Sequence, residues 1–174
     1  MGRMIDEYLD FARGDAGEAP ESVDLNALLD DVATDYRRSA RDVVYASGPS
    51  VRLMIRPYAM RRALMNLIDN ALRYGGNTAM LTLEQSLTFV RIKITDHGKG
   101  IPEADHETVF KPFTRLEPSR NALTGGVGLG LSIARAIAQS HGGDSTLEKQ
   151  RNPNGEVTGL EVTLRLPRPV QPVI

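Results

Sequence analysis

A glycine-rich run at residues 125–132 constrains the fold of this chain more than any other feature of the sequence. It reads Gly-Gly-Val-Gly-Leu-Gly-Leu-Ser, and an apolar pattern typical of a helix continues to about residue 140. Glycine lets a backbone wrap closely around a ligand, and the free amides at a helix N-terminus attract phosphate oxygens. The run therefore predicts a phosphate-binding turn that opens a helix over 128–140.

Two familiar phosphate-binding folds do not fit the surroundings of this run. A dinucleotide-binding βαβ unit places its glycines directly after its first strand, whereas here a long irregular stretch, 96–127, comes first. A P-loop ends in Lys followed by Ser or Thr, and this run ends in Leu131-Ser132.

Apolar periodicity predicts two further helices in the chain. One is expected over 25–38 with Asp24 as its N-cap, and the other over 58–74, directly after Pro57.

Alternating apolar residues predict the strands between these helices. The runs 41–47 and 50–55 are expected to pair as a hairpin about Gly48-Pro49. The remaining strands are expected at 78–84, 88–95, 144–150 and 156–166. Helices and strands in this order predict an α+β fold, a two-layer sandwich with a mixed β-sheet covered by helices on one face.

The domain organisation follows from a change in composition near the N-terminus. Residues 14–23 are small and polar and contain Pro and Gly, which is typical of a linker. Residues 1–13 have the apolar spacing of a short helix that needs a packing partner. We expect the main domain over 24–168 and a C-terminal tail at 169–174.

Composition limits the class of protein. The chain is 41% apolar and has a net charge of −1, which fits a soluble globular domain and gives no reason to expect nucleic acid as a partner. It has no cysteine, so disulfides and thiolate metal sites are excluded, and this fits the cytosol. No apolar run approaches the ~20 residues of a membrane span.

The helix 58–74 contains three polar residues that are candidates for binding a ligand. Asn66, Asn70 and Arg73 are spaced i, i+4 and i+7, so they project from one side of it. An amide oxygen is a ligand that Mg²⁺ accepts, and an arginine neutralises phosphate charge. The alternative is that the asparagines only satisfy backbone groups near the helix end.

Asp96 follows a predicted strand and begins the sequence Asp-His-Gly-Lys-Gly. Its carboxylate offers an acceptor for the exocyclic amine of adenine, and the glycines allow a sharp turn close to a ligand. An ordinary turn is the alternative. Further on, Phe110 and Phe113 precede a polar stretch, which indicates either the anchor of a loop that closes over a ligand or a surface loop pinned by buried phenylalanine.

These four elements, in this order and at these intervals, resemble the N, G1, F and G2 boxes of sensor histidine kinase ATP-binding domains. The resemblance covers about residues 24–166, and within the family it is closest to the osmosensor EnvZ type. It implies a Bergerat-type ATP-binding fold with ATP and Mg²⁺ between the helix 58–74 and the loop that closes over them.

The resemblance also implies roles for individual residues. Asn70 is the expected Mg²⁺ ligand and Asp96 the expected adenine acceptor, with Asn66, Asn70 and Arg73 as the catalytic set. The other residues expected around the nucleotide are Tyr74, Gly98, Gly100, Ile101, Phe113, Gly126, Val127, Gly128, Leu129, Gly130 and Leu131.

Two departures refine this expectation. Related ATPases such as gyrase and Hsp90 carry a water-activating Glu where this chain has Asn66, and an amide cannot act as a general base. We therefore expect a site that holds ATP for transfer to another group and hydrolyses it little. Val127 stands where the family often has Ser or Thr, so one hydroxyl contact to phosphate is lost.

The phosphoacceptor histidine expected of the family is missing. His97, His106 and His141 do not match its motif and are interpreted as structural or solvent-exposed. The chain is thus expected to be a monomeric catalytic part that donates the γ-phosphate to a histidine on a separate dimerisation domain. The parent protein is expected to be a homodimeric kinase of the bacterial inner membrane, with this domain on the cytoplasmic side and a response regulator as its partner. A serine kinase of the anti-sigma-factor kind and a non-catalytic docking module are the alternatives.

Overall fold

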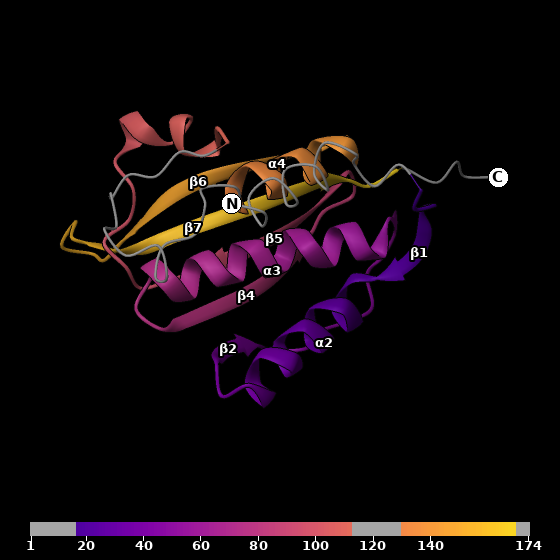
Figure 1. Ribbon diagram of the computed structural model, residues 1–174, viewed down its shortest axis with the longest axis horizontal. Helices are drawn as coiled ribbons and strands as arrows, with labels where there is room; N and C mark the ends of the chain where they lie inside the picture. The colour runs from indigo at the N-terminus through magenta and orange to yellow at the C-terminus, as the bar shows by residue number, and fades with distance from the viewer. Residues whose placement is uncertain (1–16, 113–129, 170–174) are drawn as a thin grey trace, which may run out of the picture.

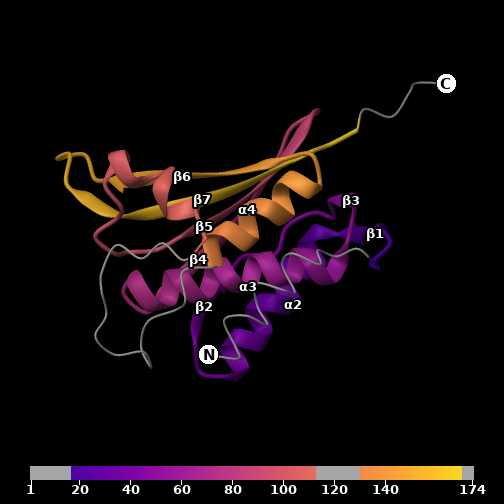
Figure 2. The same ribbon diagram turned by 45° about the horizontal axis from the view of Figure 1, so that its top comes forward.

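The computed structural model describes residues 17–112 and 130–169 and forms two layers, a β-sheet and a set of helices on one of its faces (Figures 1 and 2). The helices of the described part are α2 (Leu25–Arg38), α3 (Pro57–Tyr74) and α4 (Gly130–Ser140). The expected α+β sandwich is therefore confirmed.

The main sheet has five strands in the order β2-β4-β5-β7-β6. Strand β2 runs parallel to β4, and the other neighbours are antiparallel, so the sheet is mixed as predicted. The bounds are β2 (Asp42–Tyr45), β4 (Thr78–Gln85), β5 (Phe89–Thr95), β6 (Asp144–Arg151) and β7 (Val157–Pro167). Two 3-10 turns, η1 (Glu103–Asp105) and η2 (Thr108–Phe110), lie between β5 and α4 in the sequence.

The core lies between α3 and the inner face of the sheet. Alternate residues of the central strands, such as Ile92 and its neighbour Leu164, point inward and are fully buried. On α3 the residues Leu64, Leu67 and Ile68 meet them from the helical side, and each such buried side chain contributes about 1.5–3 kcal/mol of burial free energy. This packing fixes one side of α3 and leaves its polar side to face away from the sheet.

The hairpin expected from 41–47 and 50–55 was wrong. Strand β2 pairs with β4, whereas β3 (Arg52–Ile55) pairs with β1 (Glu21–Asp24) in a separate two-stranded sheet. The connection passes over the start of α2, where Asp24 Oδ1 accepts a hydrogen bond from the Val51 amide (3.2 Å). The Leu25 amide also donates to the Val51 carbonyl (2.8 Å). Because both hydrogen bonds hold residue 51 at the start of α2, the chain cannot turn straight back on β2.

Part of the stretch expected as a linker is ordered on the domain. Residues 21–23 belong to β1, and the Glu18 carboxylate accepts hydrogen bonds from the amides of Tyr58 (2.9 Å) and Ala59 (3.1 Å). These amides are unpaired in the first turn of α3, and Arg56 at its N-cap makes no side-chain capping bond, so Glu18 caps the helix from 40 residues upstream. The expected helix in 1–13 lies outside the described residues, as do 170–174.

None of the helices in the described part of the chain is long and apolar enough to cross a membrane.

Candidate functional site

Asp96 directly follows β5 and is almost fully buried, at 7% exposure. Its Oδ1 accepts hydrogen bonds from the amides of Gly98 (2.9 Å) and Leu160 (3.1 Å). Burial raises the pKa of Asp96 above its ordinary value, and the two amide hydrogen bonds act in the opposite direction. Among the described residues Oδ2 has no hydrogen-bond donor, so one carboxylate oxygen remains to accept from a ligand.

Glycines surround this carboxylate because the neighbouring backbones come very close. A Cβ at Gly75, at the end of α3, would overlap the side chain of Asp96, and a Cβ at Gly98 would lie 2.6 Å from the Tyr74 carbonyl oxygen. The His97 amide also donates to the Gly75 carbonyl (3.0 Å). The backbone after β5 thereby packs closely against the end of α3. This packing brings the Asp96 motif next to the asparagine motif.

Gly159 is a further residue of this close packing that was not predicted from the sequence. It lies within β7, and a Cβ there would overlap the carbonyl oxygen of Asp96, which follows the adjacent strand β5. A glycine inside a strand pattern is a signal of such close backbone approach, so the residue could have been found.

Asn66 and Asn70 lie on the polar side of α3, both half-buried. The Nδ2 of Asn66 is buried and has no hydrogen-bond acceptor among the described residues. An unpaired buried donor costs about 1–3 kcal/mol, which a ligand oxygen would recover.

The start of α4 lies directly against Asn70. A Cβ placed on Gly130, the first residue of α4, would stand 3.1 Å from Asn70 Nδ2 and 3.4 Å from its Oδ1. The fold thus joins the asparagine motif to the last described part of the glycine run. Leu131 is half-buried against the core.

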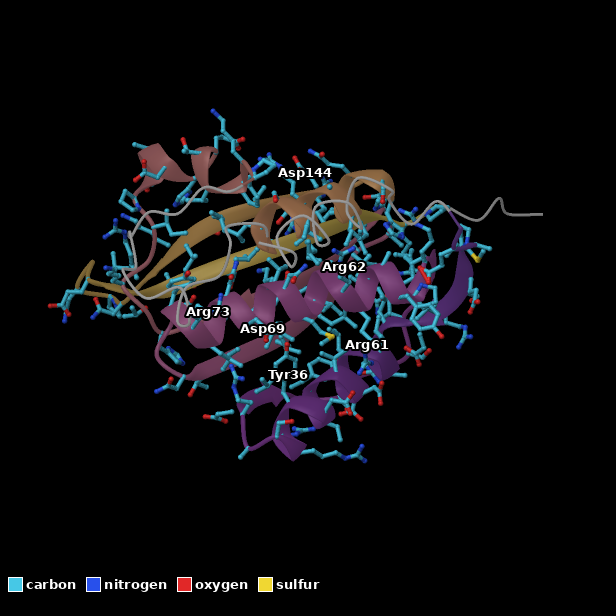
Figure 3. All side chains as sticks on the ribbon, in the orientation of Figure 1. Tyr36, Arg61, Arg62, Asp69, Arg73 and Asp144 are labelled. Atoms are coloured by element: carbon cyan, nitrogen blue, oxygen red, sulfur yellow. The ribbon has the colours of Figure 1, made fainter. Side chains whose placement is uncertain are left out.

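Arg73 and Tyr74 are exposed at the C-terminal end of α3, where Figure 3 shows Arg73. Further back along α3, Asp69 is fixed from α2, since the Tyr36 hydroxyl donates to Asp69 Oδ1 (2.7 Å) (Figure 3). This contact ties the helix that carries the asparagines to its neighbour. Burial, followed by the hydrogen bond to Asp69, raises the pKa of Tyr36 far above its usual value, so the phenol stays a donor.

The turn after Asp96 leads away from the carboxylate along the β6–β7 side. Gly100 has φ of +74°, a conformation that favours glycine, and a Cβ there would meet Val157 Cγ1 at 3.3 Å. Ile101 packs on the core. Its carbonyl oxygen lies 2.9 Å from His106 Nε2, within hydrogen-bond distance.

Phe110 is buried at the end of η2, which fits both alternatives for this stretch, and the Arg135 guanidinium lies 4.4 Å from the centre of its ring. The other residues expected at the site, Phe113, Gly126, Val127, Gly128 and Leu129, lie outside the described residues.

The three histidines have structural or exposed positions, as the sequence analysis expected. His97 is exposed, and His106 contacts the Ile101 carbonyl. His141 Nε2 accepts from the Arg56 amide (3.1 Å), while its Nδ1 lies 2.7 Å from the Ile137 carbonyl, so the neutral Nδ1–H form fits both contacts. The described part of the chain has no group of three or more His, Cys, Asp or Glu side chains that could hold a metal ion.

Comparison with known proteins gives the family context of this site. The family model described as "Histidine kinase-, DNA gyrase B-, and HSP90-like ATPase" matches residues 56–170. Among curated relatives, the sensor histidine kinase GtrS of Pseudomonas aeruginosa is 39% identical over 97% of this chain. The match covers 35% of GtrS, so the chain spans about a third of that relative's length.

Solved structures agree. The crystal structure of the ATP-binding domain of PrrB from Mycobacterium tuberculosis is 32% identical with a TM-score of 0.68, and the match covers 87% of this chain and 99% of that one. The kinase domain of the Escherichia coli osmosensor EnvZ, determined by NMR, is 29% identical with a TM-score of 0.64, covering 90% of this chain and 93% of that one.

Proposed function

Because this chain belongs to the histidine kinase-, DNA gyrase B- and HSP90-like ATPase family, as the ATP-binding catalytic domain of a two-component sensor histidine kinase, we propose that it holds Mg·ATP between α3 and the start of α4. It then presents the γ-phosphate to a histidine on a separate dimerisation domain. The observation that carries this proposal is the position of Gly130 against the amide of Asn70.

In this proposal Asp96 binds the adenine. Its unpaired Oδ2 accepts from the exocyclic amine, and the glycines at 75, 98 and 159 leave room for the close backbones that hold it. Gly100 and Ile101 border the base. A buried carboxylate with one free oxygen discriminates strongly against a base that lacks the amine, because its acceptor would then stay unpaired.

The residues of α3 are suited to bind a magnesium ion that is already coordinated by a triphosphate. Mg²⁺ is usually held by one or two protein oxygens together with substrate phosphates and waters, and the described residues offer no carboxylate cage. Asn70 supplies the amide oxygen, next to the N-terminal amides of α4 that favour phosphate. The ion would neutralise phosphate charge, Asn66 would give its unpaired amide to an oxygen of the ligand, and Arg73 and Tyr74 would approach from the exposed end of α3.

The same site predicts slow hydrolysis. Phosphoryl transfer depends mainly on positioning and charge neutralisation, and a water needs a group that orients or deprotonates it. Asn66 is an amide and cannot act as a base. We propose that bound ATP is held until a histidine acceptor reaches it. The separate dimerisation domain of a homodimeric parent protein at the inner membrane provides that histidine, and a response regulator receives the phosphate from it.

A transfer assay tests the proposed function. This chain and Mg·ATP labelled in the γ-phosphate are mixed with the dimerisation domain of the same kinase, added in trans. We expect label on the acceptor histidine, none on this chain, and very little free phosphate. Label on a serine, or rapid phosphate release without an acceptor, would overturn the proposal.

A further inference from the structure

Arg135, on α4, joins three elements that come from distant parts of the sequence. Its Nη1 donates to Glu107 Oε2 (2.9 Å) and its Nη2 to Glu107 Oε1 (3.4 Å), which is a bidentate pair. Its Nε donates to Asp144 Oδ1 (2.9 Å) at the start of β6. The face of the guanidinium lies 4.4 Å from the centre of the Phe110 ring.

This arrangement differs from an ordinary surface ion pair. The Glu107 side chain is 81% exposed, and a pair with such a partner alone contributes about 0–1 kcal/mol. Arg135 itself is only 20% exposed, and it uses both edges and one face of its planar group at once. Only arginine has this geometry, because a lysine ammonium is a point charge without a fork or a planar face.

The position of Arg135 links this contact to the nucleotide site. The turn that it holds ends at Phe110, and both Phe110 and Val109 are buried beside α4. Five residues before Arg135, the same helix begins at Gly130, against Asn70. A shift of α4 relative to η2 and β6 would therefore move Gly130 away from Asn70.

We propose that Arg135 is a positioning residue for Mg·ATP: by clamping Glu107, Phe110 and Asp144 to α4, it keeps the start of α4 in place beside Asn70. This inference rests on the proposed function. It predicts that Arg135 acts on the phosphate end of the nucleotide and leaves the adenine end alone, since Asp96 is held by β5, β7 and α3 without any contact to Arg135.

The test compares Arg135→Gln and Arg135→Lys with Arg91→Gln as a matched control. Arg91 also stacks on an aromatic ring, at 4.5 Å from the centre of Phe89, but on β5 away from the site. Mg·ATP binding is measured by calorimetry, adenosine binding by NMR titration, and thermal unfolding is recorded for each variant. The lysine variant keeps the charge and the stem, so it serves if the glutamine variant folds poorly.

We expect Arg135→Gln to weaken Mg·ATP binding about tenfold and Arg135→Lys to weaken it by less, with adenosine binding of both variants within about twofold of the parent chain. Arg91→Gln should bind both ligands normally. Adding Glu107→Gln to Arg135→Gln should cause little further loss, because the two side chains act through one contact.

Two results would overturn the positioning role while the proposed function stands. One is unchanged Mg·ATP binding in the Arg135 variants; the other is an equal loss for Mg·ATP and adenosine, which would indicate a general loss of structure. If the parent chain itself failed to bind Mg·ATP, the proposed function would fail, and the role of Arg135 with it.

Discussion

Gly130 and Asn70, sixty residues apart, meet so closely that a Cβ on Gly130 would stand 3.1 Å from Asn70 Nδ2. The contact places the positive end of α4 beside a side chain that is able to bind a metal ion. It also means that the two motifs form one site only while α3 and α4 keep their packing.

Gly130→Ala tests the importance of this close approach. The added methyl group pushes against the Asn70 amide, so we expect Mg·ATP binding to weaken by about fivefold while the free energy of unfolding changes by less than about 1 kcal/mol. Calorimetry and urea denaturation give the two values. Unchanged affinity would show that the amide of Asn70 has room to move without loss of function.

Gly75→Ala is expected to destabilise the domain. Its Cβ would overlap the side chain of Asp96, and overpacking of this kind costs about 1–3 kcal/mol. Gly48→Ala is the control, since a Cβ there has no heavy atom within 4 Å. Urea denaturation of both variants checks the prediction, and equal stability of the two would contradict the packing described at Asp96.

The raised pKa of Asp96 predicts a pH dependence. The folded-state pKa lies above the ordinary value of 3.8. At pH values between the two pKa values, the folded state therefore holds a proton that the unfolded state has lost. The contribution of Asp96 to stability is therefore fully present below pH 3.8 and is lost as the pH rises through the raised pKa.

Urea denaturation of the parent chain and Asp96→Asn across this pH range checks the sign. The stability of the parent chain relative to the variant should fall as the pH rises and then stay constant. A relative stability that rises with pH would mean that the hydrogen bonds from Gly98 and Leu160 outweigh burial. Adenine binding should need the ionised form and weaken as the pH falls through the same range.

Glu18 is expected to stabilise α3 from outside the helix. Glu18→Gln keeps the shape but removes the charge at the helix N-terminus, and Glu18→Ala removes the cap as well, so we expect losses of about 0.5 and 1 kcal/mol. Glu21→Ala is the control, because Glu21 is exposed and caps no helix. Chemical denaturation measures all three, and a Glu18→Ala variant as stable as the control would contradict the capping role.

Much of the fold was predictable because local signals and packing agree. The Asp24 cap and the apolar spacing gave α2 its observed bounds, and Pro57 marked the first turn of α3. Alternation gave the central strands to within a residue or two. In each case the buried face of the element is written in its own sequence.

The pairing of β2 and β3 was not predictable in this way. Gly48-Pro49 is a sound turn signal, but the Asp24 side chain and the Leu25 backbone, more than twenty residues upstream, decide where the chain goes. The strand β1 is short and half-polar, and only its partner β3 makes it a strand. Long-range contacts of this kind leave little trace in a local pattern.

The site shows the same division. Asn70, Asp96 and Gly130 were predicted because their motifs carry recognisable chemistry, and in the fold Gly130 lies against Asn70 while Asp96 lies against the end of α3. Arg135 gave no signal, since an arginine on a helix is usually solvated and its three partners come from separate segments. The role of Gly75 was likewise not predicted, although its missing side chain is what admits Asp96.

The central claim is that Asn70 holds a magnesium ion for a bound nucleotide, and one calorimetric experiment tests it most directly. ATP is titrated into this chain and into Asn70→Ala, with and without Mg²⁺. We expect saturable binding that Mg²⁺ strengthens in the parent chain, and a variant that keeps the magnesium-free affinity but loses the strengthening. No binding by the parent chain, or the same gain from Mg²⁺ in the variant, would contradict the account.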